Sequence, residues 1–187
     1  RMLYDAGIDA FMAPRDEAGG FRHDRLTALM HEWSDPSARG ARSETVTFLL
    51  TDLVGSTALT ALIGNSGAQR VVRAHNTIVR QVVKDYRGKE VKHTGDGLLL
   101  TFSDPSTAAR AAMEIQSEAA AYAEANPEAP LSLRVGLHTG EAGTEDGDYF
   151  GETVMLIDGI CAAADAGEIS CSEEIVARAR GPAFSFT

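Results

Sequence analysis

The chain has 187 residues, of which 44% are hydrophobic and 24% are charged. These fractions are those of ordinary globular domains, so they exclude a disordered or collagen-like chain, and the length suits one domain with an appendage. With 17 Lys and Arg residues against 27 Asp and Glu residues, the formal net charge is −10, which argues against nucleic acid or an anionic membrane surface as a partner.

Residues 1–43 are predicted to form an N-terminal helical extension and a linker. Within residues 21–33, apolar side chains recur at helical spacing: Leu26, Leu29, Met30 and Trp33. The run at 34–40, which contains Pro and Gly, is typical of a linker. Because the chain begins at Arg1 rather than Met, we interpret it as a piece of a longer polypeptide. The extension is then either a helix that packs on a dimer or the tail of an upstream domain.

From residue 44 onward, the hydrophobic pattern predicts a strand, a helix, a hairpin of two strands, a helix and a strand, followed by smaller elements. The predicted strands lie at 45–51, 90–93, 98–102, 131–137 and 168–171, the helices at 67–86, 105–124, 151–166 and 172–180, and a loop at 139–148. The order is that of the ferredoxin-like βαββαβ sandwich, an α+β fold in which helices cover one face of an antiparallel sheet.

Two acidic residues lie at places where strands end. Asp52 follows the first predicted strand, and Asp96 lies at the tip of the Gly-Asp-Gly hairpin turn. These elements are central neighbours in the ferredoxin-like order, so the two carboxylates can approach each other. Taken singly, each Asp is explained more simply as a cap or turn residue.

Together the two carboxylates predict a site for metal ions and a nucleoside triphosphate. Close carboxylates repel unless a cation separates them, and Mg²⁺ binds one or two carboxylates plus phosphate oxygens. The N–H groups that follow Asp52, at the start of a helix, offer a cradle for phosphate. They belong to Val54, Gly55, Ser56 and Thr57.

Five segments, in order along the chain, resemble motifs of the class III nucleotidyl cyclases, the adenylate and guanylate cyclases. They match the two metal motifs, the central strand, the dimer arm and the segment after the catalytic helix: residues 47–57, 92–97, 134–140, 147–151 and 161–169. The resemblance covers residues 44–187. It implies a cyclase-like domain that is truncated at its C-terminus, because the chain ends before a segment from which the family supplies a triphosphate-binding Lys.

The resemblance implies a dimer, formed with a second copy or with another cyclase domain, whose active sites lie at the interface. Asp52 and Asp96 of one protomer would hold two Mg²⁺ or Mn²⁺ ions, and Lys92 and Asp148 of the other would contact the base. Adenine suits these two residues, because its N6 amino group needs an acceptor such as Asp148 and its N1 needs a donor such as Lys92. Guanine presents the reverse pattern, so we expect ATP rather than GTP, converted to cyclic AMP and pyrophosphate.

The resemblance breaks in the predicted helix at 151–166. The family usually has an Asn that orients the ribose at the position of Met155, and an Arg that stabilises phosphate charge in the transition state at the position of Gly159. The loss of a group aimed at developing charge typically slows a reaction by about 100-fold or more. We therefore expect weak or absent turnover.

Three hypotheses remain open. The first is an adenylate cyclase of intracellular signalling. The second is a catalytically degenerate domain that binds nucleotide or pairs with an intact partner as a regulatory module. The third is an unrelated hydrolase or phosphotransferase with a similar metal pair, although the sequence contains neither a P-loop pattern nor a nucleophile-elbow pattern.

A cytoplasmic location is predicted. No apolar run approaches the ~20 residues of a membrane-spanning helix, and the N-terminus, with Asp5 and Asp9, does not resemble a signal peptide. Cys161 and Cys171 fit no metal-binding spacing and are typical of packing residues in a reducing compartment.

Overall fold

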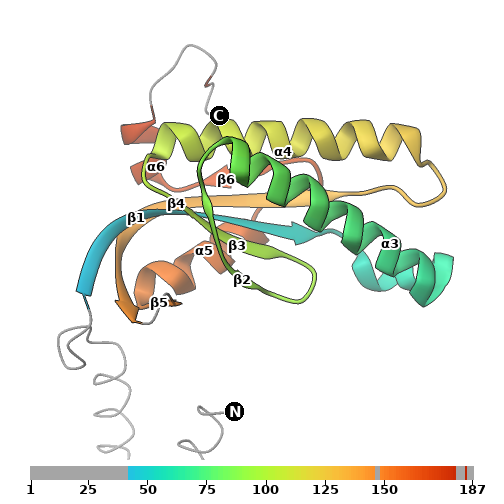
Figure 1. The fold of residues 1–187 in the computed structure, drawn as a ribbon, viewed down its shortest axis with the longest axis horizontal. Coiled ribbons are helices and arrows are strands. Elements are labelled where there is room, and N and C mark those ends of the chain that lie inside the picture. The colour runs from blue at the N-terminus through green and yellow to red at the C-terminus, as the bar shows by residue number, and fades with distance from the viewer. Residues whose placement is uncertain (1–41, 146–147, 180–183, 185–187) are drawn as a thin grey trace, which may run out of the picture. The chain divides into compact units, whose positions relative to one another are not determined.

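A computed structural model describes residues 42–145, 148–179 and 184 of the chain (Figure 1). The extension and linker predicted for residues 1–43 lie outside this part of the chain, except for the last two residues, so their boundary stays a prediction. Among the described residues, no helix is both long and apolar enough to cross a membrane.

Six strands of the described residues form one sheet. They are β1 (Arg42–Leu53), β2 (Lys89–His93), β3 (Leu98–Phe102), β4 (Leu133–Glu145), β5 (Asp148–Phe150) and β6 (Ile169–Cys171). The strand order is β2-β3-β1-β4-β5, and β6 pairs in parallel with β4. The pairs β1–β3, β2–β3 and β4–β5 are antiparallel. This order, with a helix after β1 and another after β3, confirms the predicted ferredoxin-like α+β fold.

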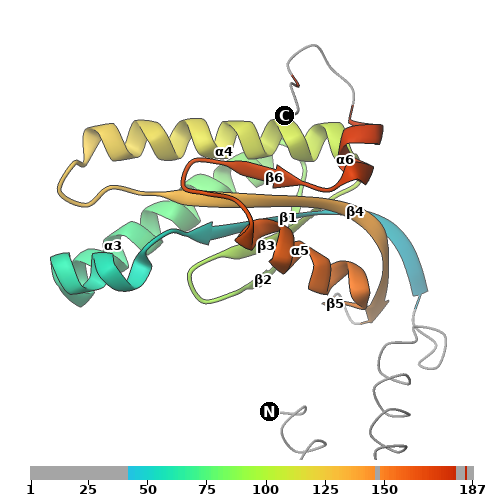
Figure 2. The same cartoon turned by 180° about the vertical axis from the view of Figure 1, so that it is seen from behind.

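Helices lie on both faces of the sheet. They are α3 (Ser56–Asp85), α4 (Pro105–Ala125), α5 (Glu152–Ala162) and α6 (Glu173–Arg178). Figures 1 and 2 show α3 and α4 together on one face and α5 on the other. The prediction that helices cover one face thus holds for α3 and α4, whereas α5 adds a layer on the opposite side.

The central strand β1 is apolar on both of its sides because it is covered on both. Leu49 and Leu53 pack into the core beneath α3 and α4, while Phe48 and Leu50 pack into a second core beneath α5. Successive side chains of a strand point to opposite faces. The polar residues at the end of β1 therefore also divide between the two faces, with Thr51 on the α3 side and Asp52 on the α5 side.

Element boundaries differ from the prediction by a few residues in most places, and by more in the following. The first long helix begins at Ser56 rather than 67, and it contains a break at Gly64, whose φ of 71° is not helical. The predicted loop at 139–148 is mostly strand, because β4 continues to Glu145 and pairs with β5. At Gly143 a side chain would overlap the Phe150 ring, so glycine permits this pairing. The helix predicted at 151–166 ends at Ala162, four residues before its predicted end.

Candidate active site

The ends of β1 and β3 place Asp52 and Asp96 on adjacent segments. Thr51 pairs with Leu98 in the antiparallel register, so Asp52 and the turn before Leu98 extend beyond the same end of the ladder. A Cβ atom at Gly97 would overlap the backbone carbonyl oxygen of Thr51. Only glycine allows the turn to lie this close to β1, and the two acidic segments meet as the sequence predicted.

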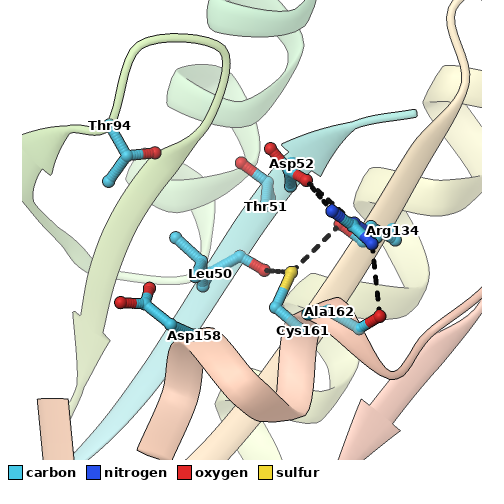
Figure 3. A pocket seen from close by; sticks show the side chains of 8 residues that line it. All are labelled: Leu50, Thr51, Asp52, Thr94, Arg134, Asp158, Cys161 and Ala162. Atoms are coloured by element: carbon cyan, nitrogen blue, oxygen red, sulfur yellow. Dashed lines mark hydrogen bonds and ion pairs between the residues drawn. The ribbon is translucent and has the colours of Figure 1, made fainter. Parts of the chain in front are cut away.

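Asp52 is held by an arginine from β4. The Asp52 Oδ2 atom accepts hydrogen bonds from Arg134 Nη2 at 2.6 Å and Arg134 Nε at 2.8 Å, and Arg134 Nη1 donates to the Ala162 carbonyl at 3.2 Å (Figure 3). The bonds to Asp52 raise the pKa of the Arg134 guanidinium above its ordinary value. Arg134 therefore neutralises Asp52 and fixes its orientation.

Arg134 has no assigned role in the sequence analysis, although its position carries a signal. It interrupts the alternation of buried Leu131, Leu133, Val135 and Leu137 and so points to the other side of its strand. A charged residue on a strand that is covered on both faces needs a partner. Its partner, Asp52, is 82 positions away in the sequence.

Asp96 is held by the first residue of α3. The Ser56 hydroxyl donates to Asp96 Oδ2 at 2.8 Å. The preceding Gly55, with a φ of 71°, is the N-cap of the helix. One helix terminus thus contacts one of the two acidic segments directly.

The predicted phosphate cradle is smaller than expected. The Val54 N–H donates to the Ser132 carbonyl at 2.9 Å, so it is already engaged. The N–H groups of Gly55, Ser56 and Thr57 lie at the start of α3, where helix geometry leaves donors without intrahelical partners. These three are the ones that remain for an anion.

A cavity of about 340 Å³ opens beside Asp52. It is lined by Leu50, Thr51, Asp52, Thr94, Arg134, Asp158, Cys161 and Ala162 (Figure 3). Burial, and the nearby Asp52 carboxylate, raise the pKa of the Cys161 thiol to about 11, so this thiol stays neutral and acts in packing, as the sequence predicted. Asp158 of α5 brings a further carboxylate to the cavity that the sequence did not single out.

Lys92 and Asp148 form an ion pair within one chain. The Lys92 Nζ and Asp148 Oδ1 atoms are 3.7 Å apart, and the two side chains are 45% and 67% exposed. They belong to β2 and β5, which stand at opposite ends of the strand order. The two strands are nevertheless in contact, because the end of β4 bends out of the sheet and carries β5 with it (Figure 1). An exposed pair of this kind adds little stability, and both side chains are open to a ligand.

Met155 and Gly159 lie together on the outer face of α5. The inner face is formed by buried Thr153, Ile157 and Cys161, whereas Met155 is 68% exposed and Gly159 is also exposed. Positions four apart lie above one another on a helix. The two departures from the family pattern thus form one apolar surface that does not line the cavity.

The two acidic residues fit a metal site only with further oxygen ligands. Among the described residues, no group of three or more His, Cys, Asp or Glu side chains could hold a metal ion. The protein therefore offers a pair of carboxylates, Asp52 and Asp96. This is the donor set with which Mg²⁺ or Mn²⁺ joins a phosphorylated substrate rather than a cage made of protein alone.

Comparisons with known proteins show which family the chain is similar to. The family model for the adenylate and guanylate cyclase catalytic domain matches residues 39–187. The chain is 29% identical over 149 residues to the serine/threonine-protein kinase pkn2 of Myxococcus xanthus, covering 79% of this chain and 18% of that protein. It is 29% identical over 189 residues to the receptor-type adenylate cyclase A of Leishmania donovani, covering 79% of this chain and 14% of that protein. The chain thus spans less than a fifth of either relative.

The fold matches solved structures of the same kind. The crystal structure of the guanylyl cyclase Cya2 superposes with a TM-score of 0.66 at 22% identity, covering 75% of this chain and 81% of that one. At this identity the likeness concerns the fold alone, and it confirms the predicted architecture.

Proposed function

The chain belongs to the adenylate and guanylate cyclase catalytic-domain family, and on that premise we propose that it converts ATP to cyclic AMP and pyrophosphate. The observation that carries the proposal is the β1–β3 register, which sets Asp52 beside the Gly-Asp-Gly turn between β2 and β3. Asp52 and Arg134 line one cavity, and Asp96 contacts Ser56 at the N-terminus of α3, whose N–H groups can bind phosphate.

Asp52 and Asp96 are the residues that would hold two Mg²⁺ or Mn²⁺ ions. Such ions, when bound, make the ribose 3′-OH a better nucleophile and neutralise charge on the phosphates. Before binding, Arg134 and Ser56 keep the two carboxylates in place.

In the proposed reaction, the bond between O3′ and the α-phosphorus forms as the bond from that phosphorus to the β-phosphate bridge breaks. The hydroxyl gives its proton to solvent water, and pyrophosphate leaves with the electron pair of the broken bond. The N–H groups of Gly55, Ser56 and Thr57 face the phosphates, as a helix N-terminus favours negative charge. The chain contributes positioning and charge neutralisation, which supply most of the rate in phosphoryl transfer.

Lys92 and Asp148 would select adenine. Their exposed ion pair presents a donor and an acceptor side by side, which complements N1 and N6 of adenine and mismatches guanine. We propose that this pair contacts the base of a nucleotide whose phosphates lie at Asp52 and Asp96 of a second protomer. This arrangement requires a dimer, and we place the reaction in cytoplasmic signalling.

A second candidate function is a partner-dependent regulatory module. It is favoured by the outer face of α5, where Met155 and Gly159 offer no hydrogen-bond donor and no charge. A homodimer would lack these groups in both sites. A heterodimer with an intact cyclase domain would keep one complete site, in which this chain supplies the carboxylates.

The experiment that tests the proposal measures product and binding together. The purified chain is incubated with ATP and Mn²⁺ at high protein concentration, with GTP as the control substrate, and binding of a fluorescent ATP analogue is followed with and without Mn²⁺. Cyclic AMP formed from ATP in excess of cyclic GMP from GTP supports the cyclase. Binding that depends on Mn²⁺ without product supports the partner-dependent module, and no binding with or without Mn²⁺ contradicts both.

A further inference from the structure

A chain of polar side chains runs beneath the two acidic segments, on the α3 side of the sheet. Thr51 Oγ1 lies 2.9 Å from His75 Nε2, and His75 Nδ1 lies 2.9 Å from the Asn76 carboxamide. The other end of that carboxamide lies 3.3 Å from His93 Nε2, and the Gly95 N–H donates to His93 Nδ1 at 3.2 Å. We call Thr51, His75, Asn76 and His93 the polar chain.

The polar chain occupies a place that packing alone would give to an apolar residue. The other buried positions on this face of α3 are glycine and valine, and His75 is fully buried among them. Burial lowers the pKa of His75, which keeps the ring neutral. A buried polar group lowers stability unless it is hydrogen-bonded, so a Leu at this position would be the simpler solution for a core.

One backbone N–H fixes the direction of every hydrogen bond. Because Gly95 donates to His93 Nδ1, the ring hydrogen of His93 lies on Nε2, which donates to the Asn76 oxygen. The Asn76 NH₂ group then donates to His75 Nδ1, and His75 Nε2–H donates to Thr51. The Asn76 oxygen then lies next to His93 and the nitrogen next to His75, which is the carboxamide turned by 180°. The two orientations have nearly the same shape, and only the direction of the hydrogen bonds distinguishes them.

Thr51 closes the chain onto β3. Its Oγ1 atom accepts from the Leu98 N–H at 3.1 Å and donates to the Leu98 carbonyl at 3.5 Å. The polar chain therefore begins at Thr51, one residue before Asp52, and its last member, His93, binds the N–H of Gly95, one residue before Asp96. Each carboxylate-bearing segment is tied to α3, and the same helix supplies Ser56 to Asp96.

From this connection we propose that the polar chain is a positioning element that fixes the separation of Asp52 and Asp96 before metal and nucleotide bind. The inference rests on the proposed function, since it gives the separation a purpose. None of the four side chains needs to touch the substrate. Outer partners of metal ligands typically change metal affinity or activity by about 10–100-fold when removed.

The test compares two threonines of the same strand. Thr51→Val removes the hydroxyl at the end of the polar chain and keeps the side-chain shape. Thr47→Val is the matched control, because Thr47 is equally buried on β1 and its Oγ1 atom lies 2.8 Å from Thr139 Oγ1, outside the polar chain. Thr51→Ser restores the hydroxyl. Asn76→Ala breaks the chain at a half-buried helix position and serves if Thr51→Val does not fold.

Two measurements are made on each variant of the 187-residue chain. The first is the Mn²⁺ concentration that gives half-maximal binding of the fluorescent ATP analogue. We expect this concentration to rise about tenfold or more in Thr51→Val and Asn76→Ala, and to stay within about twofold of the original in Thr47→Val and Thr51→Ser, even if Thr47→Val loses as much thermal stability. The second is amide hydrogen exchange at Gly95 and Leu98 without metal, which we expect to accelerate only in the first two variants.

The outcomes separate the two proposals. If the original chain shows no binding that depends on Mn²⁺, the proposed function fails, and amide exchange alone then decides whether the polar chain orders the Asp96 turn. If Thr51→Val and Asn76→Ala keep both the original Mn²⁺ dependence and the original exchange rates, the positioning role is overturned. The role is also overturned if Thr47→Val changes the Mn²⁺ dependence as much as Thr51→Val does.

Discussion

The strand ends that carry Asp52 and Asp96 and the outer face of α5 differ in how completely they are built. Each carboxylate has a side-chain partner, Arg134 or Ser56, whereas α5 presents Met155 and Gly159. The inner face of α5 is nevertheless buried, through Thr153, Ile157 and Cys161. The difference teaches that docking of a helix and the chemistry on its outer face are independent, so one can be lost while the other is kept.

The largest expected effect follows from removing charge on the carboxylate side. Asp52→Asn should weaken nucleotide binding that depends on Mn²⁺ by about 100-fold, or ~2.7 kcal/mol, because the variant loses a ligand and leaves Arg134 without its counter-ion. Titration of the fluorescent ATP analogue at fixed Mn²⁺ measures this loss.

The control for Asp52→Asn is Asp165→Asn, which makes the same charge change in an exposed loop between α5 and β6. We expect it to bind like the original chain. If Asp52→Asn binds nucleotide as tightly as the original chain, Asp52 is not a ligand of the site. The contrast between the two regions then has no basis in binding.

The next effect is a gain on the α5 side. Met155→Asn combined with Gly159→Arg should raise cyclic AMP formation by about 100-fold, since it restores a cation for the developing phosphate charge. The structure has room for it, because no heavy atom lies within 4 Å of a Cβ built on Gly159. Replacing a helix glycine should also stabilise the fold by up to ~1 kcal/mol, so loss of folding would not explain a failure.

Met155→Asn with Gly159→Gln is the control for this gain, because it adds a long polar side chain and helix propensity without charge. Initial rates of product formation with ATP and Mn²⁺ compare the two. If both double variants are as slow as the original chain, the outer face of α5 is not what limits turnover, and the contrast between the regions has no catalytic meaning.

The sequence predicted the position of the two carboxylates better than the side chains that hold them. Asp52 and Asp96 could be brought together from the strand order, because residues at the ends of central neighbours must meet. The contacts of Arg134 and His75 could not be predicted. They depend on which side chains of β4 and α3 face β1, and these elements are far from β1 in the sequence. The extension of β4 was missed because pairing with β5, rather than strand propensity, holds its Gly-rich end.

A smaller effect sharpens the role of the exposed ion pair. Lys92→Gln should reduce the preference for ATP over GTP by about tenfold, because the variant keeps a donor but loses the charge that holds Asp148 beside it. Competition of ATP and GTP for the fluorescent analogue measures the ratio. Lys89→Gln on the same strand is exposed and outside the pair, so it should keep the original preference; an equal change in both variants would assign the effect to general charge.

The smallest expected effect concerns the anchor of β5. The Tyr149 hydroxyl donates to Glu44 Oε1 at 2.7 Å, and the Tyr149 ring contacts Phe48 edge-on with centroids 5.3 Å apart. Tyr149→Phe removes this hydrogen bond, together with one between the same hydroxyl and Thr101, and keeps the ring contact. We expect it to lower the free energy of unfolding by about 1 kcal/mol, measured by urea denaturation.

Because Tyr149 is adjacent to Asp148, the same variant decides whether base selection depends on the start of β1. Tyr122→Phe is the control, since it makes the same change on α4 rather than next to Asp148, and we expect it to keep the original ATP preference. If Tyr149→Phe loses stability but keeps the ATP preference, the Lys92–Asp148 pair is positioned by β4 and β5 alone. A loss of preference as large as that of Lys92→Gln would instead contradict this, and would make Glu44 part of the machinery that holds the base-contacting residues.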